Sequence, residues 1–229
     1  GLLFYPGKQI AITPDFVGVK YRDVFIDTKT GPRLHGWWLE SEIPVKGVVY
    51  YLHGNGGNIS TNLAGVSWLT RYGYDVFMLD YRGYGLSDGK PTVRDLVQDV
   101  RLGWRWLVAR KAALQQPVFV FGQSLGAAVA GFAMVDLATP EQPSAIVLDS
   151  GFTSYQAIAK DVAAKSWLGW IFQWPVAWSM PKHYDLVDVI AQLAEYPLLL
   201  THSENDTVVP YRHAQHLLQA SKNRAELYT

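Results

Sequence analysis

The sequence contains no cysteine, no excess of either charge and no long apolar run. Without cysteine, its 229 residues form no disulfide, bind no metal through thiolates and offer no cysteine nucleophile. The 20 lysines and arginines balance the 20 aspartates and glutamates, so nothing in the overall charge favours a nucleic-acid partner. No apolar stretch reaches the roughly 18 residues that a membrane span requires. With 49% hydrophobic and 17% charged residues, the composition predicts one globular domain over residues 1–229.

Both ends of the sequence look incomplete. It starts at Gly1 rather than methionine, and the apolar residues 1–6 look cut from something longer, which predicts an upstream anchor or signal. At the other end, residues 224–229 have the pattern of a strand that is only beginning. We therefore expect a further strand and helix after Thr229.

Short apolar runs alternate with helical patterns along the chain. Residues 21–27 and 34–40 are predicted to form an antiparallel hairpin with Gly31 and Pro32 in its turn. Further strands are expected over residues 47–53, 76–79, 117–121, 145–148 and 197–200. Helices are expected over residues 60–72, from Pro91 onward, and over 127–137 and 211–220. This order predicts an α/β fold with a mostly parallel central sheet and helices on both faces.

The motif at residues 122–126 supplies a candidate nucleophile. Gly122-Gln123-Ser124-Leu125-Gly126 matches G-x-S-x-G between a predicted strand and a predicted helix, which is the context the motif requires. Its glycines let the backbone turn sharply, so that the Ser124 hydroxyl projects from the carboxyl edge of the sheet. The alternative interpretation is that Ser124 only caps the following helix.

Backbone amides near this serine are the candidate oxyanion hole. An acyl transfer needs donors for the negative oxygen of the tetrahedral intermediate, and Leu125, directly after the nucleophile, supplies the first. The glycine-rich loop at residues 53–58 follows an earlier strand, and we expect Asn55 to supply the second. The loop is otherwise a flexible turn or a phosphate cradle, although the lysine of a P-loop is absent. We interpret His53 as a structural part of this loop.

The acid that orients a catalytic base is expected after the serine in the sequence. Asp206 is the leading candidate, because it lies on the loop that follows the predicted strand at 197–200. Asp149, at the end of the preceding strand, is a rival, and Glu204 is a weaker one. The alternative for Asp206 is a turn or helix-capping aspartate.

No histidine in the sequence has the position expected of the base. His213 and His216 follow Asp206 by only 7 and 10 residues, within a predicted helix, and we interpret both as residues of the helix surface. The base is expected after the strand that begins at Arg224, beyond Thr229.

Four motifs together resemble the α/β-hydrolase superfamily. They are Leu52-His53-Gly54-Asn55-Gly56-Gly57-Asn58, Asp80-Tyr81-Arg82-Gly83-Tyr84-Gly85, the motif around Ser124, and residues 202–210. The chain looks like the branch of membrane-anchored or lipoprotein-like serine hydrolases that is related to depalmitoylating hydrolases, and distantly like prolyl oligopeptidase-type peptidases. The resemblance implies cleavage of carboxylic esters or thioesters without a cofactor or metal. It also implies membrane anchoring, with a cytoplasmic location as the alternative.

A tryptophan-rich segment stands where this superfamily inserts its cap. We expect a small cap at about residues 152–184, and residues 166–178 hold four of the nine tryptophans. The cluster fits a lid over an apolar acyl pocket, a surface that touches a membrane, or ordinary packing against the core. Tyr81 and Tyr84, after another strand, are candidate substrate contacts.

These observations favour an esterase or thioesterase that acts on a small molecule with an apolar acyl group. The alternative enzyme is a peptidase of prolyl oligopeptidase-like type. The alternative outside enzymes is a non-catalytic binding protein with the same fold. A glycine-histidine pair soon after Thr229 would favour the enzyme.

Overall fold

The computed structural model describes residues 4–28, 31–135, 137, 142–164 and 183–229. Within this part of the chain, eight strands form one sheet in the order β10-β9-β8-β7-β4-β6-β3-β2. Their bounds are β2 Tyr21–Ile26, β3 Leu34–Leu39, β4 Gly47–Leu52, β6 Tyr74–Asp80, β7 Val118–Gln123, β8 Ala145–Asp149, β9 Leu198–Thr201 and β10 Glu226–Tyr228. A separate short pair joins β1 Tyr5–Pro6 to β5 Gly56–Gly57.

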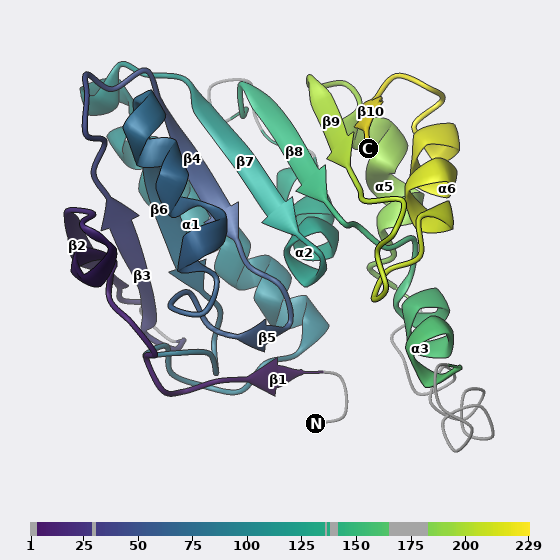
Figure 1. Cartoon of the computed structure of the whole chain (residues 1–229), viewed down its shortest axis with the longest axis horizontal. Coiled ribbons are helices and arrows are strands. Elements are labelled where there is room, and N and C mark those ends of the chain that lie inside the picture. The colour runs from purple at the N-terminus through teal and green to yellow at the C-terminus, as the bar shows by residue number, and fades with distance from the viewer. Residues whose placement is uncertain (1–3, 29–30, 136, 138–141, 165–182) are drawn as a thin grey trace.

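The sheet is parallel from β6 through β10 and antiparallel at its other edge. β2 pairs with β3, and β3 with β6, in antiparallel register, whereas β4, β6, β7, β8, β9 and β10 pair in parallel (Figure 1). The predicted hairpin and mostly parallel sheet are therefore confirmed. Because parallel strands end at the same edge, the loops after β4, β7, β8 and β9 gather there.

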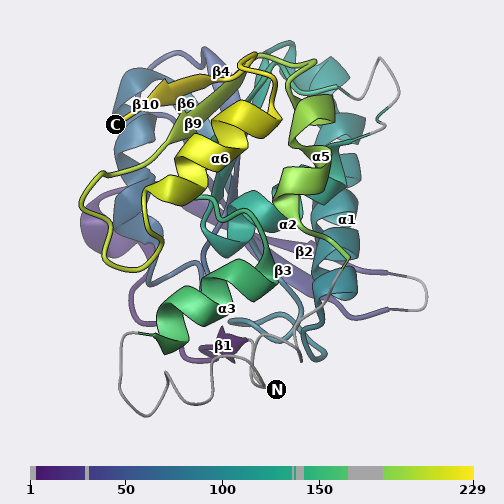
Figure 2. The same ribbon diagram turned by 90° about the vertical axis from the view of Figure 1, so that its right-hand side faces the viewer.

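Helices cover one face of the sheet. They are α1 Val93–Leu114, α2 Leu125–Met134, α5 Leu186–Leu193 and α6 Arg212–Ala220. Figure 2 shows α5 and α6 side by side, with α3 Tyr155–Ala163 beyond the carboxyl ends of the strands. No helix in the described ranges is both long enough and apolar enough to cross a membrane.

The other face carries short 3-10 helices in place of the α-helix predicted over residues 60–72. They are η2 Leu63–Gly65 and η3 Ser67–Tyr72, and a third, η1 Pro14–Val17, lies near the N-terminus. Side chains divert the backbone here: Thr61 donates its hydroxyl to the Asn58 carbonyl at 2.9 Å, and Thr70 donates to the Ser67 carbonyl at 2.8 Å. Such local bonds compete with a regular helix, which corrects the prediction.

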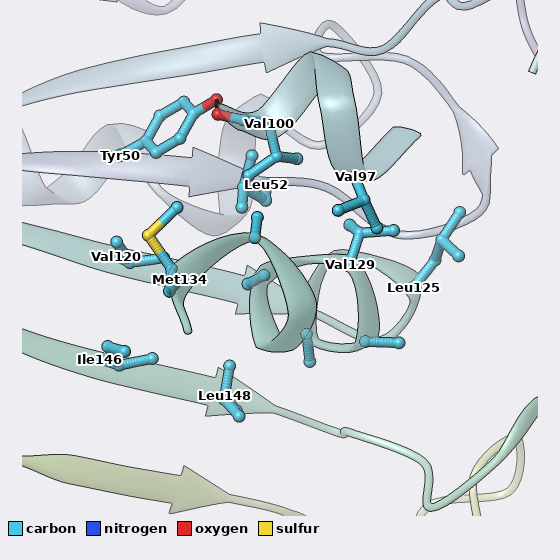
Figure 3. Packing of buried hydrophobic residues seen from close by; sticks show 14 of the residues in the cluster. Tyr50, Leu52, Val97, Val100, Val120, Leu125, Val129, Met134, Ile146 and Leu148 are labelled. Atoms are coloured by element: carbon cyan, nitrogen blue, oxygen red, sulfur yellow. Dashed lines mark hydrogen bonds between the residues drawn. The ribbon is translucent and has the colours of Figure 1, made fainter. Parts of the chain in front are cut away.

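Alternation along β4 builds a core on each face of the sheet. Val48, Tyr50 and Leu52 face α1 and α2, while Val49 and Tyr51 face the 3-10 helices. Figure 3 shows the first core closing around α2, with valines and leucines from three strands pointing toward it. Burial on both faces explains why the central strands read as continuous apolar runs.

One glycine in α1 is required by this packing. A Cβ at Gly103 would overlap the Tyr50 hydroxyl and lie 3.0 Å from Leu79 Cδ2. That hydroxyl is buried and donates to the Val100 carbonyl at 3.0 Å (Figure 3). The helix therefore passes close to β4 only because position 103 has no side chain.

We expect Gly103→Ala to destabilise the protein, although alanine normally favours a helix by about 1 kcal/mol over glycine. The overlap with Tyr50 should lower the free energy of unfolding by about 1–3 kcal/mol, measured by urea titration. Adding Tyr50→Phe removes the overlapping oxygen and should restore part of the loss. A Gly103→Ala protein at least as stable as the parent would contradict this account.

Candidate active site

Ser124 lies at a sharp turn between β7 and α2. Its backbone has φ 52° and ψ −110°, a strained conformation for a residue with a side chain. A Cβ at Gly122 would lie 2.6 Å from the Gly126 carbonyl oxygen, and one at Gly126 would overlap the Leu52 carbonyl. Gly122 is therefore required where β7 meets α2, and Gly126 is required where α2 meets β4. Ser124 makes no capping hydrogen bond with its side chain, so the alternative role as a helix cap is not supported.

The loop at residues 53–58 lies against this turn. A Cβ at Gly54 would be 3.7 Å from Ser124 Cβ, which puts the backbone just before Asn55 beside the candidate nucleophile. Leu125 is the first residue of α2, and an amide at that position has no acceptor within its own helix. The structure thus brings the segments of both predicted oxyanion donors to the serine.

The side chain of Asn55 is held by two donors from distant parts of the chain. Its Oδ1 accepts hydrogen bonds from the Tyr84 hydroxyl at 2.9 Å and from the Tyr5 backbone N–H at 3.2 Å. Next to it, β1 pairs with β5. This contact was not predicted, because residues 1–6 were interpreted only as an apolar segment that looks cut from something longer.

A buried cluster of titratable side chains lies beside the same loop. His53 Nε2 is 3.3 Å from Asp80 Oδ1, and the Asp80 carboxylate also approaches His35 Nδ1 at 3.9 Å. Burial by itself raises the pKa of Asp80, but the two imidazoles and the Ile59 N–H outweigh it and hold that pKa below its ordinary value. His53 is fully buried, which agrees with a structural role. Asp80 was quoted only as part of a motif, so its place at the centre of this cluster is new.

Tyr81 and Tyr84 are buried, and their hydroxyls bind the loop at residues 53–58. Tyr81 donates to the His53 carbonyl at 2.8 Å, and Tyr84 donates to Asn55. These contacts favour a role in shaping the loop over direct contact with a substrate.

Asp206 lies on the loop between β9 and α6. Its Oδ1 accepts from the Val208 and Val209 N–H groups at 2.7 and 2.9 Å, and Oδ2 is 3.7 Å from His202 Nε2. Partial burial raises its pKa, but the two amides outweigh that effect and lower the pKa below the ordinary value. The carboxylate therefore stays ionised near neutral pH.

The rival acids have different surroundings. Asp149 accepts from the Thr201 hydroxyl at 2.8 Å through one oxygen and from Gln123 Nε2 at 3.1 Å through the other, so both oxygens bind residues at the strand ends. Glu204 is exposed. Asp206 and Asp149 are therefore both held by hydrogen-bond donors near the strand ends.

The structure corrects the prediction that His213 lies on the surface of its helix. His216 is exposed as predicted, but His213 is buried. Its Nδ1 accepts from the Thr153 N–H at 3.1 Å, and its Nε2 lies 2.8 Å from Asp161 Oδ2 on α3. His213 shares the inner face of α6 with Ala214 and Leu217, a helical spacing that the sequence analysis did not apply.

The predictions about a metal and a cap concern different parts of the chain. Across the described ranges, no group of three or more histidine, aspartate and glutamate side chains is placed to hold a metal ion. Of the expected cap at 152–184, α3 is described, whereas the tryptophan-rich residues 166–178 lie outside the described residues.

The architecture and the strained serine turn define the class: this is an α/β hydrolase. The chain belongs to the Hydrolase_4 family, described as serine aminopeptidase, S33, which matches residues 43–190. It is 32% identical over 228 residues to the uncharacterized protein YfhR of Escherichia coli (strain K12), covering 98% of this chain and 75% of that protein.

Two further likenesses bear on the fold and the activity. The lysophosphatidylserine lipase ABHD12 of Macaca fascicularis is 33% identical over 187 residues, covering 77% of this chain and 46% of that protein. The esterase Pf2001 of Pyrococcus furiosus has a TM-score of 0.78 at 24% identity, covering 99% of this chain and 87% of that structure, and shares the fold.

Acid should loosen the contact between α3 and α6. Burial, which outweighs the opposing effect of Asp161, lowers the pKa of His213 below 6.5. The folded state therefore favours neutral His213, and its stabilisation is complete above pH 6.5 and lost as the pH falls through the folded pKa. Over that window His213→Gln should flatten the decline in the free energy of unfolding, which for one proton is at most about 1.4 kcal/mol per pH unit.

The matched control is His216→Gln on the exposed face of the same helix. Urea titrations between pH 7.5 and 5 should give this control the pH dependence of the parent. Equal slopes for His213→Gln and the parent would refute the assignment.

Proposed function

We propose that this α/β hydrolase is a serine hydrolase that cleaves carboxylic ester or thioester bonds through an acyl-enzyme on Ser124. The strained conformation of Ser124 carries the proposal, because a residue held at φ 52° between two obligatory glycines has a cost that a purely structural turn avoids. The adjacent amides and the ionised Asp206 are consistent with the same chemistry.

In the first half-reaction, Ser124 Oγ attacks the carbonyl carbon of the substrate and gives its proton to a histidine base. The amides of Leu125 and Asn55 bind the negative oxygen of the tetrahedral intermediate. The intermediate expels the alcohol or thiol, which takes the proton from the histidine. Water then attacks the acyl-enzyme by the same route, releasing the acid and restoring Ser124.

In this proposal the histidine is carried on a segment that follows β10, and Asp206 orients it. β10 runs beside the start of the loop between β9 and α6, which holds Asp206, since the His202 N–H donates to the Tyr228 carbonyl at 3.0 Å. A hollow of about 460 Å³ opens at these strand ends, and the residues that line it include Asp149, His202 and Tyr228. The lining also includes Glu204 and Asn205, the two residues before Asp206 in the loop.

The proposed substrate is a small ester or thioester with an apolar acyl group. The similarity to the lysophosphatidylserine lipase ABHD12, which spans 77% of this chain and 46% of that protein, supports this substrate class. We extend the proposal to the membrane-anchored, depalmitoylase-related branch, with membrane contact through the tryptophan-rich residues 166–178. The second candidate is a peptidase, which the family description as a serine aminopeptidase favours.

The first test is labelling of the full-length protein with a fluorophosphonate probe. We expect one adduct by intact mass and none in Ser124→Ala, because only an activated serine reacts. Hydrolysis of a p-nitrophenyl butyrate substrate should fall by at least about 10³-fold in the variant. A folded parent protein that is neither labelled nor active would reject the hydrolase and favour a non-catalytic binding protein. Turnover of an aminoacyl amide in preference to the ester would favour the peptidase.

The choice of acid is tested by Asp206→Asn, Asp149→Asn and Glu204→Gln. Loss of the Asp206 charge removes the partner of the catalytic imidazole, so kcat should fall by about 10²–10⁴-fold. The other two variants should keep kcat within about tenfold of the parent, since in this scheme Asp206 alone orients the base, although Asp149 and Glu204 line the hollow. The reverse ranking of Asp206 and Asp149 would assign the acid to Asp149.

A further inference from the structure

We propose that Tyr84 and strand β1 are positioning elements of the oxyanion hole, acting through the side chain of Asn55. The inference rests on the proposed function, because it assigns to Asn55 one of the two amides that bind the oxyanion. Neither Tyr84 nor Tyr5 touches the reacting atoms in this account. Both hold the residue that does.

We call the two hydrogen bonds that Asn55 Oδ1 accepts the clamp. Its first half is the Tyr84 hydroxyl, which donates to Asn55 Oδ1 at 2.9 Å. The Tyr84 ring is fully buried and packs edge-on against His53 and Tyr81, with ring centroids 5.1 and 5.7 Å away. A buried hydroxyl without a partner is costly, so this ring has one favourable orientation, and that orientation fixes Asn55.

The second half is the backbone of the N-terminal segment. The Tyr5 N–H donates to Asn55 Oδ1 at 3.2 Å, while its ring is 69% exposed and adds little packing. Two residues after Tyr5, the Gly7 N–H donates to the Gly57 carbonyl at 2.8 Å. The first described residues therefore run alongside the oxyanion loop as an added strand.

Gly7 connects this strand to the Tyr84 loop as well. Its carbonyl accepts from the Gly85 N–H at 2.8 Å and from Asn58 Nδ2 at 3.1 Å. Three segments that are far apart in the sequence thus meet at the loop: the N-terminus, residues 55–58 and residues 84–85. The Asn55 side chain is held by two donors, and the next two residues pair with β1, so the backbone amide of Asn55 is constrained in direction before the substrate arrives. A fixed direction is the condition for strong oxyanion binding.

The sharpest test of the hydroxyl is Tyr84→Phe, which keeps the ring and removes one oxygen. The control is Tyr72→Phe, at a tyrosine that is 60% exposed. In the full-length protein we expect kcat for p-nitrophenyl butyrate to fall about tenfold in Tyr84→Phe with KM within about twofold, as for a loss of transition-state binding. Hydrogen exchange of a peptide covering residues 53–60 should become faster, and the control should change neither.

The backbone donor is tested by comparing Tyr5→Pro with Tyr5→Ala. Proline removes the N–H, whereas alanine removes the exposed ring and keeps the donor. We expect faster exchange over residues 53–60 and a reduced kcat in Tyr5→Pro alone. Thermal unfolding of each variant checks that it is folded.

The outcomes separate this inference from the proposed function. Unchanged exchange over residues 53–60 in both Tyr84→Phe and Tyr5→Pro would overturn the clamp, whatever the activity. Faster exchange with unchanged kcat would overturn the positioning role. If the parent is not labelled at Ser124, the proposed function fails and the positioning role with it, while the exchange data still decide whether the clamp exists.

Discussion

The close approach of α2 to the carboxyl end of β4 is the constraint on which the site depends. Gly126 rests against the Leu52 carbonyl, and any side chain there would push the helix away from the sheet. With the helix so near, the chain leaves β7 through a serine at φ 52°, and the side chain of this serine makes no helix-capping hydrogen bond. The same contact brings the loop after β4 to that serine. The packing of α2, the strained turn at Ser124 and the placement of the loop at residues 53–58 therefore depend on one another.

The oxyanion loop depends on polar groups buried under it and beside it. Asp80 is fully buried, and such a charge is tolerated only when polar partners surround it. The Ile59 N–H donates to it at 2.9 Å, and the His53 and His35 imidazoles lie 3.3 and 3.9 Å away. The loop at residues 53–58 thus packs on the buried polar side chains of Asp80, Tyr81 and Tyr84. Preorganised amides are worth more than flexible ones, because their orientation is settled before the reaction.

Most of the fold could be predicted from the sequence, because buried parallel strands and amphipathic helices have strong local patterns. The antiparallel hairpin and the strand–serine–helix turn were predicted correctly, and the family resemblance was supported at the level of the superfamily. The error at residues 60–72 has a local cause, since threonine hydroxyls take up the backbone carbonyls that a helix would use. His213 was misplaced because its burial depends on α3, which packs on α6 from a distant part of the chain.

The sequence by itself determined the sheet, the serine turn and the order of the candidate groups, since each depends on residues adjacent in the chain. Tertiary structure decided what surrounds them. The Tyr84 hydroxyl and the Tyr5 N–H both donate to Asn55 Oδ1, through contacts that span 29 and 50 residues of sequence. No local pattern encodes such contacts, because the partner of a buried hydroxyl is chosen by whichever acceptor the completed fold brings within reach.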